Sequence, residues 1–266
     1  MNEADNRRTS HAPADNFFWY AFLVWTLIGA LVMPFGIGES TVRRMIASDV
    51  MADAIAMVLR PADAIWMVLA FGVVYLHVAR ERGLAVARMW GLVILLGSGA
   101  IEAVGALTGW PFGPYHYTDN LGLRLFGVLP FTIPLAWFVI VATAHCAIQA
   151  LRPAWARWRQ ALAVGAVATL TDLNLEFIAW KARAYWIWYP PGSEQAADPP
   201  AWPPLQNYVS WFAVAFVLSL ALTGGRAVRS AGGATSPRFP LRPVVVLGLM
   251  NALFLLVHLA RWLGLS

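Results

Sequence analysis

Two acidic residues, Asp172 and Glu176, lie four positions apart inside a long apolar run. On a helix, residues at this spacing share one face, so both carboxyl groups would point the same way. A carboxylate near the middle of a bilayer costs about 2.5–3.5 kcal/mol on insertion scales. The pair is therefore expected to face the interior of a helix bundle or a wet cavity, where it is a candidate for proton transfer.

Such a pair suits a particular kind of chemistry. A buried carboxylic acid can stay protonated at neutral pH and donate its proton, and a second carboxylate nearby strengthens this effect. Aromatic rings attract cations through their π faces. Acids beside aromatic walls inside a membrane suit protonation of an alkene in a lipid substrate, because the rings shield the carbocation until water or another double bond captures it.

The composition indicates how these groups are positioned. The chain has 266 residues, 59% hydrophobic and 12% charged, whereas a soluble domain carries about 25% charge. Several apolar runs approach the roughly 20 residues that span a hydrocarbon core. We expect an all-α, polytopic transmembrane bundle. The net charge of +5 comes from Arg residues in short loops, which favours a role in membrane topology over nucleic-acid binding. The single Cys146 excludes an intrachain disulfide.

Seven spans are predicted within one domain over residues 17–266, after a polar cytoplasmic tail over residues 1–16. The predicted spans are Phe17–Phe35, Ala62–Ala79, Ala87–Leu107, Val128–Ala150, Trp158–Trp180, Asn207–Thr223 and Pro243–Leu263. The segment Thr41–Arg60 is expected to form an interfacial or a water-exposed helix. The loop over residues 224–242 is rich in Gly, Ser and Pro and is predicted to be a flexible linker.

The distribution of basic residues predicts the orientation. Twelve Arg residues fall in the N-terminal tail and the even-numbered loops, against seven Lys and Arg residues in the odd-numbered loops and at the C-terminal end. This bias places the N-terminus in the cytoplasm. Glu102, Asp172, Glu176 and Asn207 then lie toward the outer ends of their spans, and His258 is a further candidate for this level.

Two loops on the same side are rich in aromatic residues. One, GWPFGPYHYTDN, covers Gly109–Asn120, and the other begins at Tyr185 with YWIWYPPG. Trp and Tyr gather at membrane interfaces in any case, so an aromatic belt is one interpretation of the second loop. In the first loop Gly and Pro fix the turns, and we expect its aromatic side chains to cap the carboxylate cavity.

These residues carry a resemblance to a known family. The matching pieces are Glu102 with the glycines that follow it, FGPYHY, Pro130 and Pro134 with Trp137, DLNLEF, and PLQNYVSWF. Over this central part, the chain resembles the carotenoid biosynthesis protein family of bacterial and archaeal membranes, which includes carotenoid 1,2-hydratases. The resemblance implies a multi-pass protein of the inner membrane, a lipid-soluble carotenoid substrate, and other carotenoid-pathway enzymes as candidate partners.

The resemblance also implies a reaction. Water would add across the terminal C1=C2 double bond of an acyclic end group, by protonation of the CH carbon and capture of the tertiary cation. No metal or redox cofactor is expected. Asp172 is predicted to donate the proton because it lies deepest, with Glu176 and Glu102 positioning water or holding the second charge. The residues expected to bind substrate are Trp110, Phe112, Tyr115, Tyr117, Trp137, Trp186, Trp188, Asn207 and Trp211.

Other functions stay open at this point. A carotenoid cyclase uses the same first step, with an internal alkene in place of water. A proton-coupled transporter would use the acids as a relay, but the run ALAVGAVATL in the cytoplasmic half of the fifth span offers almost no polar group. A non-catalytic scaffold is a third alternative. A metal site could be built from Asp172, Glu176 and His258, although the chain has no HExxH motif.

Overall fold

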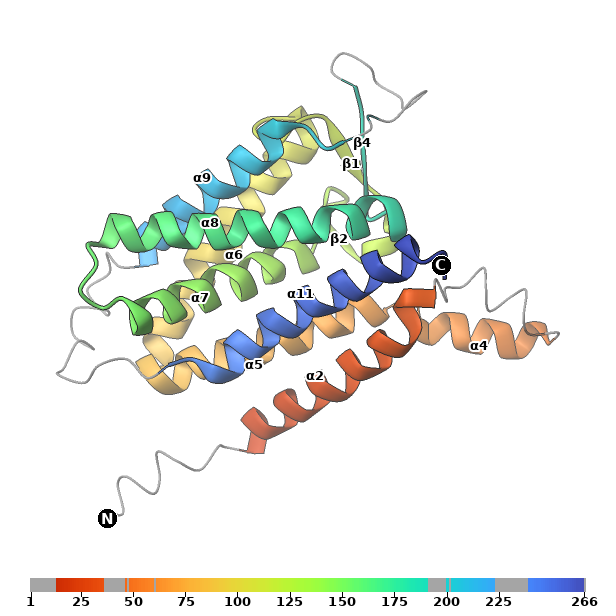
Figure 1. Cartoon of the computed structure of the whole chain (residues 1–266), viewed down its shortest axis with the longest axis horizontal. Helices are drawn as coiled ribbons and strands as arrows, with labels where there is room; N and C mark the ends of the chain where they lie inside the picture. Colours follow the sequence, from red (N-terminus) through yellow and green to blue (C-terminus); the bar gives the residue numbers. More distant parts are fainter. Residues whose placement is uncertain are drawn as a thin grey trace.

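The computed structural model describes residues 13–35, 46, 48–59, 61–190, 200, 202–222 and 239–265. Within these residues, seven helical segments are long and apolar enough to cross a membrane (Figure 1). They are Pro13–Phe35, Ala62–Arg82, Leu84–Thr108, Thr132–Leu151, Arg157–Ala182, Leu205–Leu222 and Leu241–Trp262. The predicted all-α bundle of seven spans is therefore confirmed.

The spans are built from these elements. The first is α2 (Pro13–Val32) with the short η1 (Met33–Phe35), and the fifth is α8 (Arg157–Phe177) with η3, a π-helical turn (Ile178–Ala182). Each other span is one helix: α5 (Ala62–Arg82), α6 (Leu84–Thr108), α7 (Thr132–Leu151), α9 (Leu205–Leu222) and α11 (Leu241–Trp262). α7 is the most buried span, and α8 packs most extensively against α9.

The fourth span begins later than the sequence predicts. Residues from Val128 onward were expected to be helical, but Leu129–Pro130 form strand β3, which pairs with β2 (Arg124–Leu125). Between the strands, Phe126 and Gly127 have φ angles of 52° and 73°, which make the tight turn of a hairpin. Hydropathy alone does not separate an apolar hairpin from the first turn of a helix, so the prediction was wrong here.

A second pair of strands joins two distant loops. β1 (Tyr115–Tyr117) runs antiparallel to β4 (Trp186–Trp188), with Tyr115 opposite Trp188 and Tyr117 opposite Trp186. Alternate residues of a strand point to opposite faces. Both strands bury their first and third side chains, so one face of this aromatic ribbon carries four buried rings.

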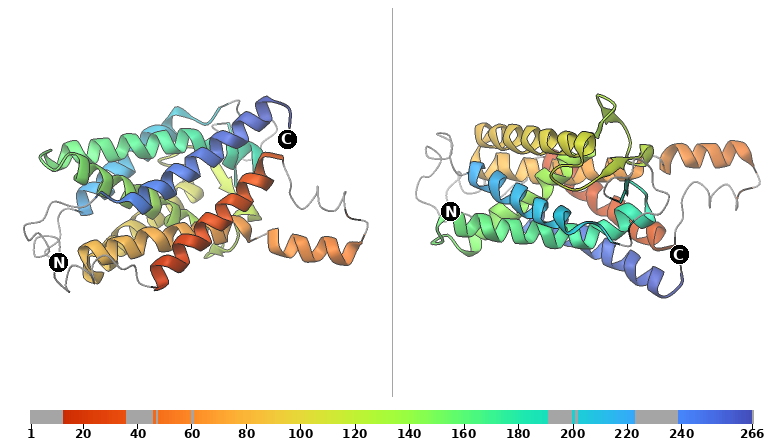
Figure 2. Two further views of the ribbon diagram at one scale, coloured as in Figure 1. Left: turned by 60° about the horizontal axis from the view of Figure 1, so that its bottom comes forward. Right: turned by 90° about the horizontal axis from the view of Figure 1, so that it is seen from above.

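The two ends of the bundle differ. The start of α2 and the turn between α7 and α8 lie at one end, whereas the aromatic ribbon, η3 and the C-terminal end of α11 lie at the other, which we call the ribbon end (Figure 1). The predicted Thr41–Arg60 helix is seen only as α4 (Asp49–Leu59), which stands apart from the bundle in both views of Figure 2. Residues 1–12 of the predicted tail, residue 223 of the predicted sixth span and residues 224–238 of the predicted linker lie outside the described residues.

Candidate active site

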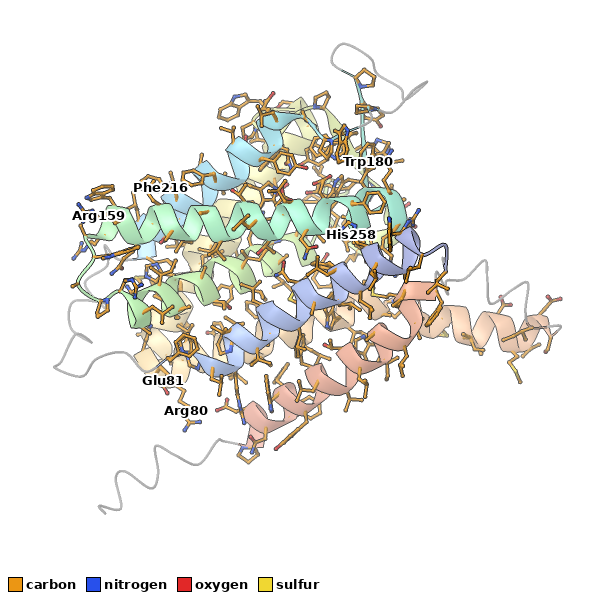
Figure 3. All side chains as sticks on the ribbon, in the orientation of Figure 1. Arg80, Glu81, Arg159, Trp180, Phe216 and His258 are labelled. Carbon is orange, nitrogen blue, oxygen red and sulfur yellow. The ribbon has the colours of Figure 1, made fainter. Side chains whose placement is uncertain are left out.

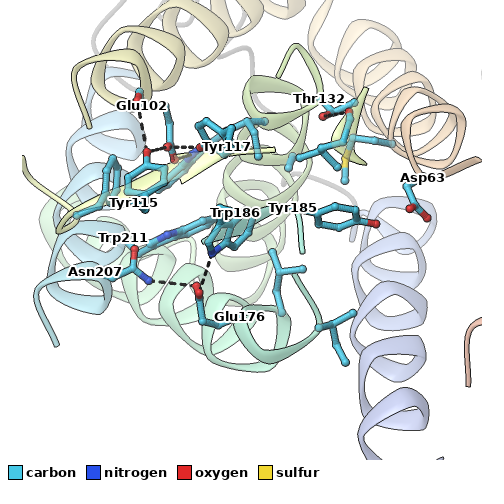
Figure 4. Close-up of a pocket in the computed structure, with 18 of the residues that line it drawn as sticks. Asp63, Glu102, Tyr115, Tyr117, Thr132, Glu176, Tyr185, Trp186, Asn207 and Trp211 are labelled. Atoms are coloured by element: carbon cyan, nitrogen blue, oxygen red, sulfur yellow. Dashed lines mark hydrogen bonds between the residues drawn. The ribbon is translucent and has the colours of Figure 1, made fainter. Parts of the chain in front are cut away.

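A cavity at the ribbon end is enclosed mainly by aromatic and aliphatic side chains (Figure 4). Three of the residues at one end of it are polar: Glu102, Glu176 and Asn207. The aromatic residues that line it are Trp66, Phe112, Tyr115, Tyr117, Trp137, Tyr185, Trp186, Trp188, Trp211 and Phe254. The cavity thus combines carboxyl groups with ring surfaces, as the sequence predicts for this level of the bundle.

Glu102 of α6 is held by three donors from other segments. The hydroxyls of Tyr117 and Tyr115 donate to Oε2 at 2.7 and 2.9 Å, and Trp137 Nε1 donates to Oε1 at 2.8 Å. Burial, and next the Glu102 carboxylate, raise the pKa of Tyr115 and Tyr117 well above the usual value. Both phenols therefore stay protonated near neutral pH and act as donors, which fixes the position of this carboxyl group.

The approach of the ribbon to α6 depends on Gly105, one turn after Glu102. A Cβ at this position would lie 2.6 Å from the ring of Phe112 and 3.0 Å from the hydroxyl of Tyr115. Separations this short do not occur between real Cβ atoms and ring carbons, so a side chain here would push the loop away. The glycine lets the tyrosine hydroxyl reach the carboxyl group.

Glu176 of α8 is held by the other strand of the ribbon. Trp186 Nε1 and Trp188 Nε1 donate to its Oε1 at 2.8 and 2.6 Å, and Asn207 Nδ2 lies 3.4 Å from Oε2. An indole N–H can only donate. Oε1 is therefore committed as an acceptor, and Oε2 is the oxygen that can carry a proton.

Asp172 lies one turn before Glu176 and is fully buried. Its Oδ2 accepts a hydrogen bond of 2.9 Å from Asn207 Nδ2, and its Oδ1 has no hydrogen-bond partner among the described residues. The amide of Asn207 therefore contacts the carboxyl groups of both Asp172 and Glu176. We call Asp172 and Glu176 the acid pair. Asp172 itself is not among the residues that line the cavity.

Local backbone structure turns the ribbon back onto the acid pair. η3 ends α8 with a π-helical turn, after which Tyr185 N donates to the carbonyl of Ala179 at 2.7 Å and Ala184 takes a positive φ of 47°. The chain turns there, and strand β4 leaves the end of α8 across the direction of the helix (Figure 1). From this strand, Trp186 and Trp188, ten and twelve positions after Glu176, donate to its carboxyl group.

The structure brings together most of the residues predicted to bind substrate. Of the nine, all but Trp110 line the cavity. Trp137 and Trp211 stack with ring centroids 4.0 Å apart and planes 17° apart. Trp110 points away, with 62% of its surface exposed, because the turn closed by the Gly113 N–H and the Gly109 carbonyl directs Phe112 inward instead.

The predicted convergence does not include His258. Its Nε2 lies 3.0 Å from the carbonyl oxygen of Asn174, and its ring centroid lies 5.0 Å from that of Phe177. Figure 3 places it on α11, beside the end of α8. In the described part of the chain, no group of three His, Cys, Asp or Glu side chains is placed to hold a metal ion. The alternative metal site with Asp172 and Glu176 is therefore not assembled.

Some cavity residues were missed by sequence reasoning. Asp63 lies in the first turn of α5, where an acidic residue is expected simply to favour the helix N-terminus. Trp66, Thr132 and Phe254 lie within apolar runs without a distinguishing pattern. The ribbon left a usable signal, because aromatic residues at alternate positions in YHY and WIW have the period of a strand.

Fold and site together define a multi-pass membrane protein, with seven candidate spans in its described residues and buried carboxyl groups at an aromatic-lined cavity. Residues 62–264 match the model of the family described as carotenoid biosynthesis protein. This match covers well over half of the chain, so the chain belongs to that family, and the resemblance seen in the sequence is confirmed.

One curated relative extends this result. The bisanhydrobacterioruberin hydratase of Haloarcula japonica is 33% identical over 136 residues, which are 50% of this chain and 42% of the relative. The chain thus spans less than half the length of that protein. No solved structure matches.

Proposed function

We propose that this protein is a carotenoid hydratase that adds water across the terminal C1=C2 double bond of an acyclic end group. The observation that carries the proposal is the acid pair, with Glu176 on the wall of a cavity that is otherwise mostly aromatic and aliphatic. Membership of the carotenoid biosynthesis family and the hydratase name of the relative support the same reaction class.

The chemical steps follow from the arrangement. A carboxyl proton is transferred to the CH carbon of the alkene, and the π electrons form the new C–H bond. A tertiary cation is left on the dimethyl carbon, where ring faces such as those of Trp137 and Trp211 stabilise it. The oxygen of a water molecule then bonds to this carbon. The water gives one proton back to the carboxylate, so the net change is addition of H₂O and the acid is regenerated.

The two acids take different roles in this proposal. Two buried carboxyl groups so close together resist being ionised at the same time, so the acid pair holds one proton between them. Glu176 lines the cavity and hands the proton to the substrate, whereas Asp172 lies behind it and shares the charge through Asn207. The sequence-based expectation placed direct transfer on Asp172, and direct transfer from Glu176 fits the lining of the cavity better.

The pigments of a lycopene-producing bacterial host test the proposal. Expression of the full chain is expected to yield a product heavier than lycopene by one water. A product of unchanged mass with altered chromatographic retention would identify a cyclase instead. Unchanged lycopene beside membrane-inserted protein would contradict both activities. A host that expresses Glu176→Gln is the matched control and is expected to accumulate lycopene.

A further inference from the structure

A second polar group lines the cavity, away from the acid pair. It consists of Asp63 at the start of α5 and Tyr185 just before the ribbon, with Arg183 bound to both. We call these three residues the polar gate. Figure 4 shows Asp63 and Tyr185 at the opposite end of the cavity from Glu176 and Asn207.

The polar gate is a closed hydrogen-bonded unit. Arg183 donates to Asp63 Oδ2 through both Nη2 and Nε, the latter at 3.1 Å, and its Nε lies 3.3 Å from the hydroxyl of Tyr185. The backbone beside it is fixed as well, because Asn120 Nδ2 donates to the carbonyls of Arg183 and Ala184. Burial raises the pKa of Tyr185 well above its usual value, so the hydroxyl stays neutral and can both donate and accept.

The polar gate also reaches solvent. The side chains of Arg183 and Asp63 are 28% and 12% exposed, whereas Glu102, Glu176 and Asn207 are 4% exposed or less. Asp63 lies in the first helical turn of its span, at the level where a transmembrane helix meets the aqueous boundary. Partly solvent-exposed polar side chains thus lie at one end of the cavity, and the acids lie at the other (Figure 4).

We propose that Asp63, Arg183 and Tyr185 form the inlet through which water reaches the cation. The inference rests on the proposed hydratase reaction, which consumes one water in each turnover at a site lined mainly by apolar and aromatic side chains. Water crosses apolar surfaces poorly unless polar groups offer it hydrogen bonds. The polar gate offers a carboxylate, a guanidinium and a hydroxyl between solvent and the cavity.

The inlet predicts a change of product rather than only a loss of rate. A cation that water does not reach can lose a proton from a methyl group to the carboxylate. This restores the acid, moves the double bond to the end of the chain, and needs no water. In D₂O the acid transfers a deuteron, so this isomer carries one deuterium at the former CH carbon. The deuterium distinguishes the isomer from unreacted substrate.

The test uses the full chain purified in detergent and equilibrated in D₂O, with lycopene as substrate in a single turnover. The double variant Asp63→Leu/Arg183→Leu leaves no unpaired charge behind. Its ratio of hydrate to deuterated isomer is expected to fall at least about tenfold, since each hydrogen bond lost to a passing water can change a rate by up to about that factor. The control Asp119→Leu/Arg124→Leu removes an ion pair outside the cavity and should keep the wild-type ratio.

A wild-type ratio of hydrate to isomer in the double variant would overturn the inlet, even if total turnover falls. An equal fall of this ratio in the control variant would also overturn it. If the double variant does not fold, Tyr185→Phe decides, because it removes only a hydroxyl: a lower ratio supports the inlet and a wild-type ratio overturns it. Wild-type protein that forms neither hydrate nor isomer would instead contradict the proposed function itself.

Discussion

The two halves of α8 present the same stripe of the helix to very different surroundings. In the first half, Ala161, Gly165 and Ala168 are buried against neighbouring helices, and a Cβ on Gly165 would lie 3.0 Å from the ring of Phe212. In the second half, Asp172 and Glu176 occupy the stripe and meet an amide and two indoles. The small residues of the first half allow close helix packing. The second half carries the hydrogen-bonded acids and borders the cavity.

This difference bears on the transporter alternative. A proton relay along α8 needs side chains that pass a proton beyond the acid pair. The hydroxyls of Thr169 and Thr171 instead donate to carbonyls of their own helix, at Gly165 and Val167. The polar stripe therefore stops near Asp172, as the apolar sequence of this half predicts, and the acids lie toward one end of the bundle.

The largest effect is expected from neutralising the acid pair. Glu176→Gln and Asp172→Asn should each lower the hydration rate at least about 100-fold, because general acid catalysis contributes about 10²–10⁴-fold. Folding should survive, since an amide is cheaper to bury than a charge. The measurement is the rate of hydrate formation by purified protein, with Thr169→Val in the packed half as the control. Near-normal turnover by well-folded Glu176→Gln would remove it as the donor, and the same result for Asp172→Asn would show that the donor does not need Asp172 to share the charge.

A smaller loss is expected at Glu102. In Glu102→Gln, the amide NH₂ replaces an oxygen that accepts hydrogen bonds from Trp137 or from Tyr115 and Tyr117. One or more buried donors then lose their acceptor, at about 1–3 kcal/mol. If the positioning of these rings contributes to catalysis, hydration should fall by roughly tenfold. Activity as low as that of Glu176→Gln would instead place the transferred proton on the third span.

The packed half should respond in stability rather than in chemistry. Gly165→Val forces a side chain against Phe212, and such overpacking typically costs about 1–3 kcal/mol. The apparent melting temperature in detergent should fall, whereas the ratio of hydrate to isomer should stay that of the wild type. Gly248→Val on α11 is the control, because a Cβ there meets no atom within 4 Å. A shift of product ratio in Gly165→Val would mean that the two halves of α8 are coupled.

The smallest effect is expected from removing metal ions. One proton and one water suffice for the proposed reaction, so exhaustive chelation of the purified protein should leave the hydration rate unchanged. A loss of activity that a divalent ion restores would show that the acid pair acts with a metal after all. Treatment with the chelator already saturated with calcium is the matched control.

Sequence reasoning reached the helices and the level of the acids for a clear physical reason. Spans are set by length and hydropathy, and their alternation brings Glu102, Asp172 and Asn207 to the same end whatever the details of packing. It did not reach the pairing of β1 with β4, because the partners are about seventy positions apart and no local sequence pattern specifies which segments pair. Asp63 was missed for the same reason, since its partner Arg183 comes from the far side of four spans.

The aromatic ribbon links the acids to the wall of the cavity. The acids belong to α6 and α8, whereas four of the rings that shape the cavity belong to β1 and β4. The four rings donate hydrogen bonds to Glu102 and Glu176, so exchanging one of them alters the shape of the cavity and also the hydrogen bonding of a carboxyl group. If the proposed reaction holds, the shape of the cavity and the strength of the acid are therefore expected to change together.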